Sequence, residues 1–273
     1  MHKKELNKAT ILKVGITSSY KDELIRFLTL SLEQKQASKP IFITTPNSEQ
    51  LVQATTNDTF RLTLNRSTIA LPDGIGIVIA SKLLHRAGKL QSYLKKRLTG
   101  REMMISLCQL AASRKKRVFL LGGRPGVAAA AADQLTSRFN GLKVASWPGV
   151  KDITKESSVE LAQTLGRIES HRSDILFVAY GAPRQELWVA KNLTDLQKIG
   201  VKIIMVVGGA FDIIAGKLPT APKGIQSSGL EWLWRLIFEP WRFKRQLRLV
   251  KFWWLIFKQL LHRNNLVSPR GPR

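Results

Sequence analysis

The chain has 273 residues, of which 44% are hydrophobic and 23% charged, so it can bury one large core or two smaller ones, and intrinsic disorder is excluded as its default state. Its 44 Lys and Arg residues outnumber 19 Asp and Glu, and the formal net charge of +25 indicates an anionic partner: nucleic acid, anionic lipid or a phosphorylated substrate. The single cysteine, Cys108, excludes a disulfide framework and a cysteine zinc site, and its apolar neighbours predict a buried small hydrophobe.

Short segments rich in Ile and Val alternate with helix-length segments along most of the chain. This pattern predicts an α/β fold of Rossmann-like βα units, with a mostly parallel sheet covered by helices. The expected strands span residues 11–15, 41–44, 68–71, 117–121, 142–145, 175–179 and 202–207. Changes of composition near residues 95–100 and near Ser228 divide the chain into residues 1–100, 101–228 and 229–273.

Several expected strands run directly into Pro, Gly, Asn or Asp, and in open α/β sheets ligands bind at that carboxyl edge. Asp73, in the turn Pro72-Asp73-Gly74-Ile75-Gly76, is the candidate general base, although a helix N-cap explains the same aspartate. Thr45 and Asn47 offer a hydroxyl and an amide that can bond sugar hydroxyls, and capping or turn formation is the alternative for both.

Three further strand ends carry candidate binding residues. Gly122 and Gly123 resemble a phosphate-binding turn, and a plain strand-to-helix turn is the alternative. Gln185 can donate and accept toward a nucleotide or phosphate, whereas the neighbouring Glu186 is interpreted as complementing a helix dipole. The loop after the last expected strand offers Gly208, Gly209 and Asp212, where Asp212 either contacts a ribose or sugar hydroxyl or fixes its own loop.

The sequence contains no D-x-D, H-x-H or H-E-x-x-H spacing and its four histidines are scattered, so metal catalysis is disfavoured and no cofactor is expected. It also lacks the roughly 18 uninterrupted apolar residues of a membrane-spanning helix, and its N-terminal apolar stretch is too short for a secretion signal. Any contact with a membrane is therefore expected to be peripheral.

The C-terminal part is both aromatic and basic, a mixture that suits the interface of an anionic bilayer. The residues expected to contact the membrane are Trp241, Arg242, Lys244, Arg245, Arg248, Trp253 and Trp254. A core or oligomer helix with a solvated basic face is the rival interpretation. Nucleic-acid binding is not favoured, because the glycine-ended sheet edge needs another purpose.

Taken together, five motifs in order resemble the WecG/TagA/CpsF glycosyltransferase family over roughly residues 41–248. They are Thr45-Pro46-Asn47, Pro72-Asp73-Gly74-Ile75-Gly76, Gly181-Ala182-Pro183-Arg184-Gln185-Glu186, Gly208-Gly209-Ala210-Phe211-Asp212 and Gly229-Leu230-Glu231-Trp232. The resemblance implies an inverting, metal-independent transfer, typically of N-acetylmannosamine or its uronic acid from a UDP-sugar to polyprenyl-diphosphate-linked N-acetylglucosamine, for teichoic acid, enterobacterial common antigen or capsule.

By the same resemblance, Asp73 takes a proton from the acceptor hydroxyl, Thr45 and Asn47 place the sugars, and Gln185 places the donor. Arg97 matches a family arginine that steadies the leaving diphosphate; a surface charge is the alternative. Residues 1–100 then form the lobe with acceptor and catalytic loops, and residues 101–228 the nucleotide-sugar lobe. The expected partners are a UDP-sugar, a lipid-linked acceptor and the inner face of the plasma membrane, reached from the cytoplasm.

The sequence departs from the family pattern in three places. Thr220 stands where the family usually shows arginine, Glu102 stands where aspartate is commoner, and extra residues separate Leu84 from Arg97. These departures leave the donor sugar and the acceptor geometry open, and a homo-oligomer is also left open. A function from another class, a non-catalytic nucleotide- or nucleic-acid-binding α/β module, remains the alternative.

Overall fold

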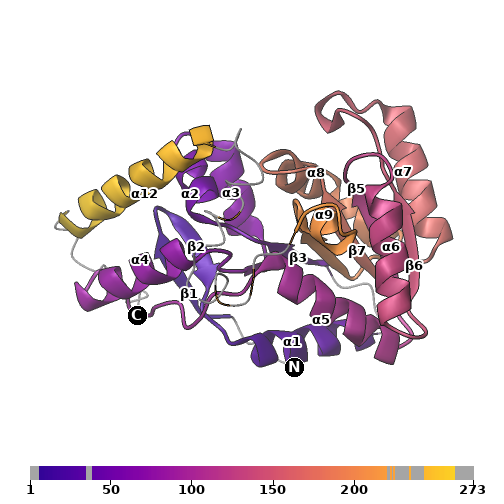
Figure 1. Ribbon diagram of the computed structural model, residues 1–273, viewed down its shortest axis with the longest axis horizontal. Helices are drawn as coiled ribbons and strands as arrows, with labels where there is room; N and C mark the ends of the chain where they lie inside the picture. The colour runs from indigo at the N-terminus through magenta and orange to yellow at the C-terminus, as the bar shows by residue number, and fades with distance from the viewer. Residues whose placement is uncertain are drawn as a thin grey trace, which may run out of the picture.

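The computed structural model describes residues 6–34, 39–219 and 243–261, together with the single positions 222, 224 and 234. A six-stranded parallel sheet in the order β4-β3-β8-β7-β5-β6 crosses the molecule (Figure 1). Its strands are β3 (Ile41–Thr44), β4 (Ile69–Ala70), β5 (Arg117–Gly122), β6 (Lys143–Trp147), β7 (Ile175–Ala179) and β8 (Ile203–Val206). The predicted α/β fold with a parallel sheet is confirmed.

The prediction of one strand at residues 11–15 is wrong. An antiparallel hairpin stands there, with β1 (Lys8–Ile11) paired to β2 (Val14–Thr17). Leu12 and Lys13 adopt left-handed backbone angles, with φ of 47° and 66°, and turn the chain between the two strands. Hairpin turns usually show Gly, Asn or Asp at such positions, so this turn gives no signal in the sequence.

Helices cover both faces of the sheet. On one face lie α1 (Lys21–Glu33), α5 (Gly100–Ser113), α6 (Val127–Arg138) and α9 (Ala210–Ile214), and on the other the 3-10 helix η1 (Ile153–Lys155), α7 (Ser158–Ser170) and α8 (Arg184–Lys198). Successive strand residues point to opposite faces, so Phe177 packs under the first set and Val178 under the second. This double cover explains why the strands are apolar throughout.

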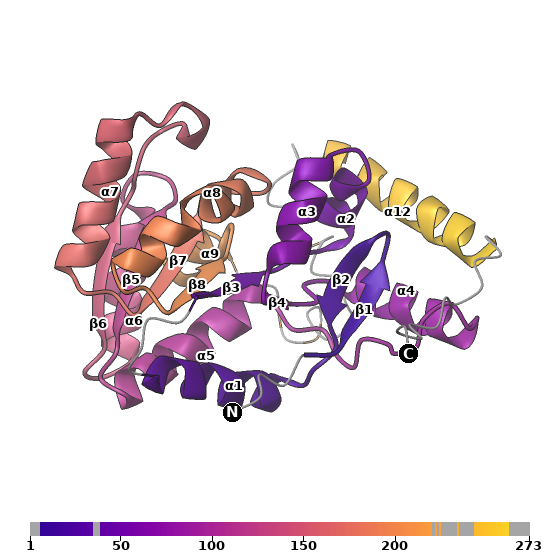
Figure 2. The same cartoon turned by 180° about the vertical axis from the view of Figure 1, so that it is seen from behind.

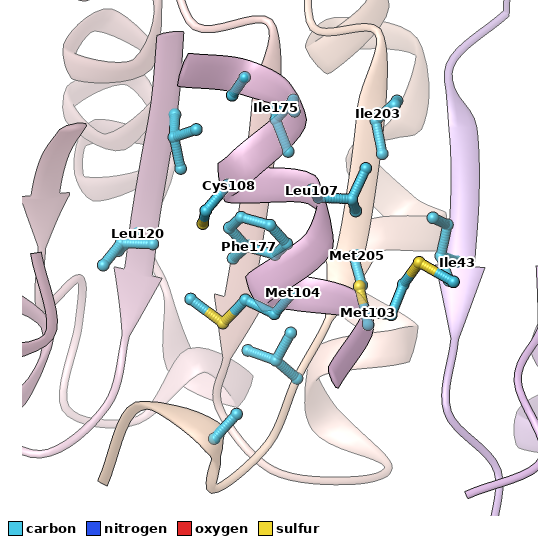
Figure 3. Close-up of a cluster of buried hydrophobic side chains, with 14 of the residues drawn as sticks. Ile43, Met103, Met104, Leu107, Cys108, Leu120, Ile175, Phe177, Ile203 and Met205 are labelled. Atoms are coloured by element: carbon cyan, nitrogen blue, oxygen red, sulfur yellow. The ribbon is translucent and has the colours of Figure 1, made fainter. Parts of the chain in front are cut away.

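Helix α5 packs its apolar side directly on the middle of the sheet, as Figure 3 shows for Met103, Met104, Leu107 and Cys108. Cys108 is fully buried, and burial raises the pKa of its thiol to about 12. The thiol is therefore protonated at neutral pH, and the prediction of a buried small hydrophobe is confirmed.

A third cluster joins the hairpin to α2 (Ser48–Ala54), α3 (Asp58–Arg66), α4 (Ile75–Arg86) and the C-terminal helix α12 (Phe243–Leu261). Figures 1 and 2 show α12 running along α2 and close to α4. Phe252 and Ile256 of α12 are buried in this cluster. The described part of the C-terminal segment is thus an amphipathic helix docked on the body of the protein.

The three-part division of the chain stays a prediction. Strands from the first two parts share a single sheet, because β3 pairs with β8 in parallel register through Ile41 and Ile203. The consequence is geometric: loops from residues 1–100 and from residues 101–228 emerge side by side at one edge of that sheet.

Candidate active site

A cavity of about 500 Å³ lies where the loops after β3, β4, β7 and β8 meet. The residues predicted from sequence that line it are Thr45, Asn47, Asp73, Arg97, Gln185, Gly208 and Gly209. These four loops therefore converge on one cavity, as expected, and that they form a binding site stays a prediction. The volume is ample for a small polar ligand, since ligand sites typically measure about 300–1,000 Å³.

Asn47, after β3, both lines the cavity and caps α2. Its Oδ1 accepts a hydrogen bond from Gln50 N at 3.0 Å, and its own N donates to Gln50 Oε1 at 3.1 Å. This reciprocal capping box satisfies amide groups that the first turn leaves open. Thr45, only 7% exposed, stands beside it. The capping interpretation of Asn47 is confirmed, and its contact with a sugar stays a prediction.

Asp73 is held from two directions at the end of β4. Its N donates to Pro46 O at 3.1 Å, and its Oδ2 accepts from Gly100 N, at the start of α5, at 3.2 Å. The N-cap of the helix that follows Asp73 is Gly74, so the N-cap interpretation of Asp73 for α4 is wrong. The half-buried carboxyl lines the cavity at the N-terminus of α5, where the helix dipole favours negative charge.

Gly100 leaves room for this arrangement. A Cβ there would lie 3.1 Å from Thr45 Cγ2 and 3.7 Å from Asp73 Oδ2, so a larger residue would displace Thr45. Gly76, at the start of α4, is constrained in the same way, because a Cβ would lie 2.7 Å from Ser48 Oγ. Two glycines of the sequence motifs thus permit close packing of helix starts around the cavity.

Arg97 and Arg101 bring two guanidinium groups to the lining near Asp73. Leu98 N donates to Pro72 O at 3.0 Å, which fixes this segment beside the Asp73 turn. The added length before Arg97 folds back on the protein, since Leu94 is fully buried and its N donates to Ser81 Oγ at 3.0 Å. Arg97 is therefore no free surface charge, and Arg101 is a cation that the sequence analysis did not single out.

Thr99 and Glu102 explain one departure from the family pattern. Thr99 caps α5, and its N and Oγ1 donate to Glu102 Oε2 at 3.0 Å and 2.9 Å, while Glu102 N donates to Thr99 Oγ1 at 3.2 Å. Glutamate is the usual acidic member of such a capping box. Glu102 thus serves the helix start that presents Gly100 N to Asp73.

Gln185 is almost entirely buried, with 1% of its surface exposed, although it touches the cavity. Its Oε1 accepts from Gly181 N at 3.1 Å and from Gly208 N at 3.2 Å. The side chain therefore ties the loop after β7 to the loop after β8. Its direct contact with a donor stays a prediction.

Gly122, Gly123 and Asp212 do not line the cavity among the residues that the structure describes. Gly122 has φ of 96°, and a Cβ on it would lie 3.0 Å from Ala179 O, so a glycine is needed where β5 passes β7. Asp212 Oδ1 accepts from Arg124 Nε at 3.1 Å and from its NH2 group at 2.6 Å. Their contact with phosphate or ribose stays a prediction.

A family model described as "Glycosyl transferase WecG/TagA/CpsF family" matches residues 9–266. The chain belongs to this glycosyltransferase family. It is similar to proteins named N-acetylglucosaminyldiphosphoundecaprenol N-acetyl-beta-D-mannosaminyltransferase. Identity is 31% to that of Bacillus spizizenii over 84% of each chain, 32% to that of Bacillus subtilis (strain 168) over 80% of this chain and 79% of the relative, and 31% to that of Staphylococcus aureus (strain MRSA252) over 82% of each.

In this glycosyltransferase, α12 contributes to the cavity. Leu249 and Trp253 line it, and Arg248 forms an ion pair with Glu49, another lining residue, at 2.6 Å. Trp254 is half exposed, and Lys258 Nζ lies 3.7 Å from the centre of its indole ring. Part of the segment predicted to contact a membrane is thus also part of the site.

The rest of that predicted contact lies outside the described residues: Trp241 and Arg242, and the side chains of Lys244 and Arg245. The same holds for Thr220 and for the motif at residues 229–232. No helix in the described ranges is long and apolar enough to cross a membrane. Within those ranges, no three His, Cys, Asp or Glu side chains come together as a metal site requires.

Sequence reasoning missed several lining residues of the glycosyltransferase, namely Ser48, Gln50, Thr99, Arg101, Leu249 and Trp253. Gln50 and Thr99 had a signal, because Asn47 with Gln50 and Thr99 with Glu102 have the three-residue spacing of a capping box. Trp253 had none, since nothing local links a C-terminal helix to loops about 200 residues earlier.

Proposed function

We propose that the enzyme transfers N-acetylmannosamine, or its uronic acid, from a UDP-sugar to N-acetylglucosamine carried on a polyprenyl diphosphate, with inversion and without a metal, in the synthesis of a cell-surface polysaccharide such as teichoic acid. The observation that carries the proposal is the Asp73 carboxyl beside Arg97 and Arg101 in one cavity. The curated relatives, named for transfer to N-acetylglucosaminyldiphosphoundecaprenol, support this choice of sugar and acceptor.

The reaction is a direct displacement. Asp73 takes the proton of the acceptor hydroxyl as the hydroxyl oxygen forms a bond to the anomeric carbon of the donor sugar. The bond from that carbon to the diphosphate oxygen breaks at the same time, and the electron pair leaves with UDP. Attack from the face opposite to UDP inverts the anomeric centre.

Negative charge develops on the departing diphosphate, and Arg97 and Arg101 are the side chains on the cavity lining that neutralise it. A guanidinium presents donors in a fixed fork that matches two phosphate oxygens. The donor is held by the loops at residues 181–185 and 208–210, whose spacing Gln185 sets. Thr45 and Asn47 bind sugar hydroxyls on the side of Asp73.

The enzyme is a peripheral protein on the inner face of the plasma membrane. Its lipid-linked acceptor reaches the cavity from the face formed by α4 and α12. Exposed apolar side chains gather on these two helices: Ile75, Ile79, Leu83, Leu247, Val250, Trp253, Trp254, Phe257 and Leu261. Ile75, Ile79 and Trp253 also line the cavity, so this apolar surface reaches its mouth. Lys251 and Lys258 add positive charge for anionic lipid.

A donor panel tests the proposal. Purified protein is incubated with individual UDP-sugars and a short-chain lipid-diphosphate N-acetylglucosamine, and the products are weighed by mass spectrometry. We expect a product larger by one N-acetylhexosamine or its uronic acid, with UDP released and with full activity in EDTA. Failure of every UDP-sugar in the panel, or a strict need for a divalent cation, would contradict the proposal.

A further inference from the structure

Glu186, in the first turn of α8, is fully buried next to the cavity-lining Gln185. Its Oε1 accepts from Gln185 Nε2 at 3.0 Å and from Gln50 Nε2 at 3.4 Å. Its Oε2 is buried without a hydrogen-bond partner in the described part of the chain. A buried acid with an unsatisfied oxygen destabilises a fold, so complementing the dipole of α8 does not account for this placement.

The two amides that contact Glu186 hold backbone on two sides of the cavity. Gln50 Oε1 accepts from Asn47 N at 3.1 Å, on the side of the β3 and β4 loops. Gln185 Oε1 accepts from the N of Gly181 and of Gly208, on the side of the β7 and β8 loops. In both side chains the carbonyl faces backbone N–H groups and the NH2 faces Glu186.

The orientation of these amides depends on Glu186. A side-chain amide has one accepting end and one donating end, and a flip would aim NH2 groups at backbone N–H donors. Oε1 of Glu186 accepts from both Nε2 atoms, which fixes both carbonyls toward the backbone. Gln50 and Glu186 lie 136 residues apart, so this acceptor joins distant parts of the chain.

We infer that Glu186 is a positioning residue of the transferase: its Oε1 locks the amides of Gln50 and Gln185, and through them sets the distance between the Asn47 loop and the Gly181 and Gly208 loops. The inference rests on the proposed function in taking the cavity as the place of transfer. Asn47 lies on the acceptor side and Gly208 on the donor side, so a shift between them misaligns the two sugars, and small misplacements are costly in group transfer.

The lock needs an acceptor at Oε1 and does not need a charge. Burial raises the pKa of Glu186 to about 7, so both protonation states are populated near neutral pH. In the neutral acid the proton is on Oε2, because Oε2 accepts no hydrogen bond from the described residues that protonation would break, and Oε1 remains an acceptor. Glu186→Gln therefore preserves the lock, whereas Glu186→Met fills the same space without an acceptor.

The kinetic experiment compares the full-length wild type, E186Q and E186M under one set of conditions, at a temperature well below the Tm of each. We expect kcat/KM of E186M to fall at least about tenfold, and that of E186Q to stay within about threefold of wild type. The loss in E186M falls on kcat as well as on KM, because reacting atoms are misplaced. Equal losses in E186Q and E186M overturn the inference.

Asn192→Leu is the matched control on the same helix. Asn192 is 3% exposed and its Nδ2 donates to Trp188 O at 3.0 Å, within α8 and away from the Glu186 contacts. N192L lowers Tm by removing a buried polar contact and leaves kcat/KM near the wild-type value. If E186M loses no more activity than N192L, Glu186 contributes only stability and the positioning role is refuted.

Hydrogen–deuterium exchange gives a readout that needs no substrate. The amides of Asn47, Gly181 and Gly208 should exchange at least about tenfold faster in E186M and unchanged in E186Q. If the wild type transfers no sugar, the proposed function is wrong, but the exchange pattern still tests whether Glu186 holds the Gln50 and Gln185 amides in place. Should E186M not fold, Glu186→Asp, which withdraws the oxygens by one methylene, replaces it; wild-type exchange and kinetics in that variant overturn the inference.

Discussion

One side of the cavity, formed by the loops after β3 and β4 and by the segment that leads into α5, carries the ionisable groups of Asp73, Arg97 and Arg101. The other side, formed by the loops after β7 and β8, is lined by Gly, Ala, Val and Ile residues and the Gln185 amide. On the second side, the acid Glu186 is withdrawn from the surface entirely. Under the proposed mechanism, this contrast assigns proton and charge chemistry to the first side and the shape of the cavity to the second. Substitutions on the two sides should therefore fail in different ways.

The largest expected effect is that of Asp73→Asn. The amide retains an oxygen for Gly100 N, so folding and UDP binding should persist, but the base is lost. General-base catalysis contributes about 10²–10⁴-fold, and kcat should fall by about that factor. Steady-state transfer and a UDP thermal shift measure the two properties. Wild-type turnover by D73N would mean that Asp73 is not the general base, and the proposed difference between the two sides would be wrong.

Arg97→Lys should come next. Lysine keeps the charge and loses the fork that grips two phosphate oxygens, so kcat is expected to fall about a hundredfold with little change in Tm. Arg101→Lys, measured in parallel, shows whether the two cations share the leaving group equally. If both variants turn over like the wild type, neither guanidinium contacts the diphosphate.

On the shape-giving side the sharpest prediction concerns stability against pH. The pKa of Glu186 is raised from 4.5 to about 7, chiefly by burial and against the hydrogen bond from Gln185. Between these pH values the folded protein keeps a proton that the unfolded chain has released. The free energy of unfolding therefore falls as pH rises from about 4.5 to about 7, by on the order of 3 kcal/mol from this group.

Glu186→Gln removes that titration. Urea unfolding of wild type and E186Q at pH 5, 6, 7 and 8 should show E186Q gaining stability relative to wild type through this range, and no further above it. A difference between the two proteins that does not change with pH would mean that Glu186 is ionised throughout and that its burial has no such cost.

A smaller effect is expected from the outer face of α12. Trp254 and Phe257 are 50% and 57% exposed, so replacing both by Ser should leave Tm nearly unchanged. Binding to anionic vesicles should weaken by about tenfold through lost apolar burial. Transfer to a short-chain, water-soluble acceptor should be unaffected. Unchanged vesicle binding, measured by flotation, would place the membrane contact on another surface.

The smallest effect is expected from Asp212→Asn, which tests a residue outside the cavity lining. Its partner Arg124 is 68% exposed, and exposed ion pairs contribute at most about 1 kcal/mol. Both kcat/KM and Tm should stay close to the wild-type values in the same assays. A loss of donor affinity in D212N would instead restore the ribose contact that the sequence motif suggested.

Much of the chemical side of the cavity could be predicted from the sequence. Asp73, Thr45 and Asn47 follow apolar strands in turns, and the carboxyl ends of parallel strands meet at one edge whatever the rest of the chain does. The family resemblance, carried by the same motifs, supplied Arg97. Local patterns were sufficient because each residue is placed by the strand or helix next to it.

The remainder depended on contacts between distant parts of the chain. The motif predicts that Gln185 contacts a ligand, but the orientation of its side-chain amide depends on a hydrogen bond from Gly208, 23 residues further on. Gln50 and Glu186 are linked across 136 residues, and Trp253 of the C-terminal helix lines the same cavity as Asn47 and Asp73 from the first part of the chain. The β1–β2 hairpin was not predicted for a local reason. Leu12 and Lys13 occupy turn positions that are usually Gly, Asn or Asp.

Helix α12 presents three surfaces within one short stretch of chain. Phe252 and Ile256 are buried against the protein, Leu249 and Trp253 line the cavity, and Trp254 and Phe257 are exposed. Under the proposed function, exchanging this helix between relatives would therefore change both its packing on the protein and the path of the acceptor. If the acceptor enters past α12 as proposed, substitutions at positions 249 and 253 alone would change the entry path and leave the packing of Phe252 and Ile256 intact.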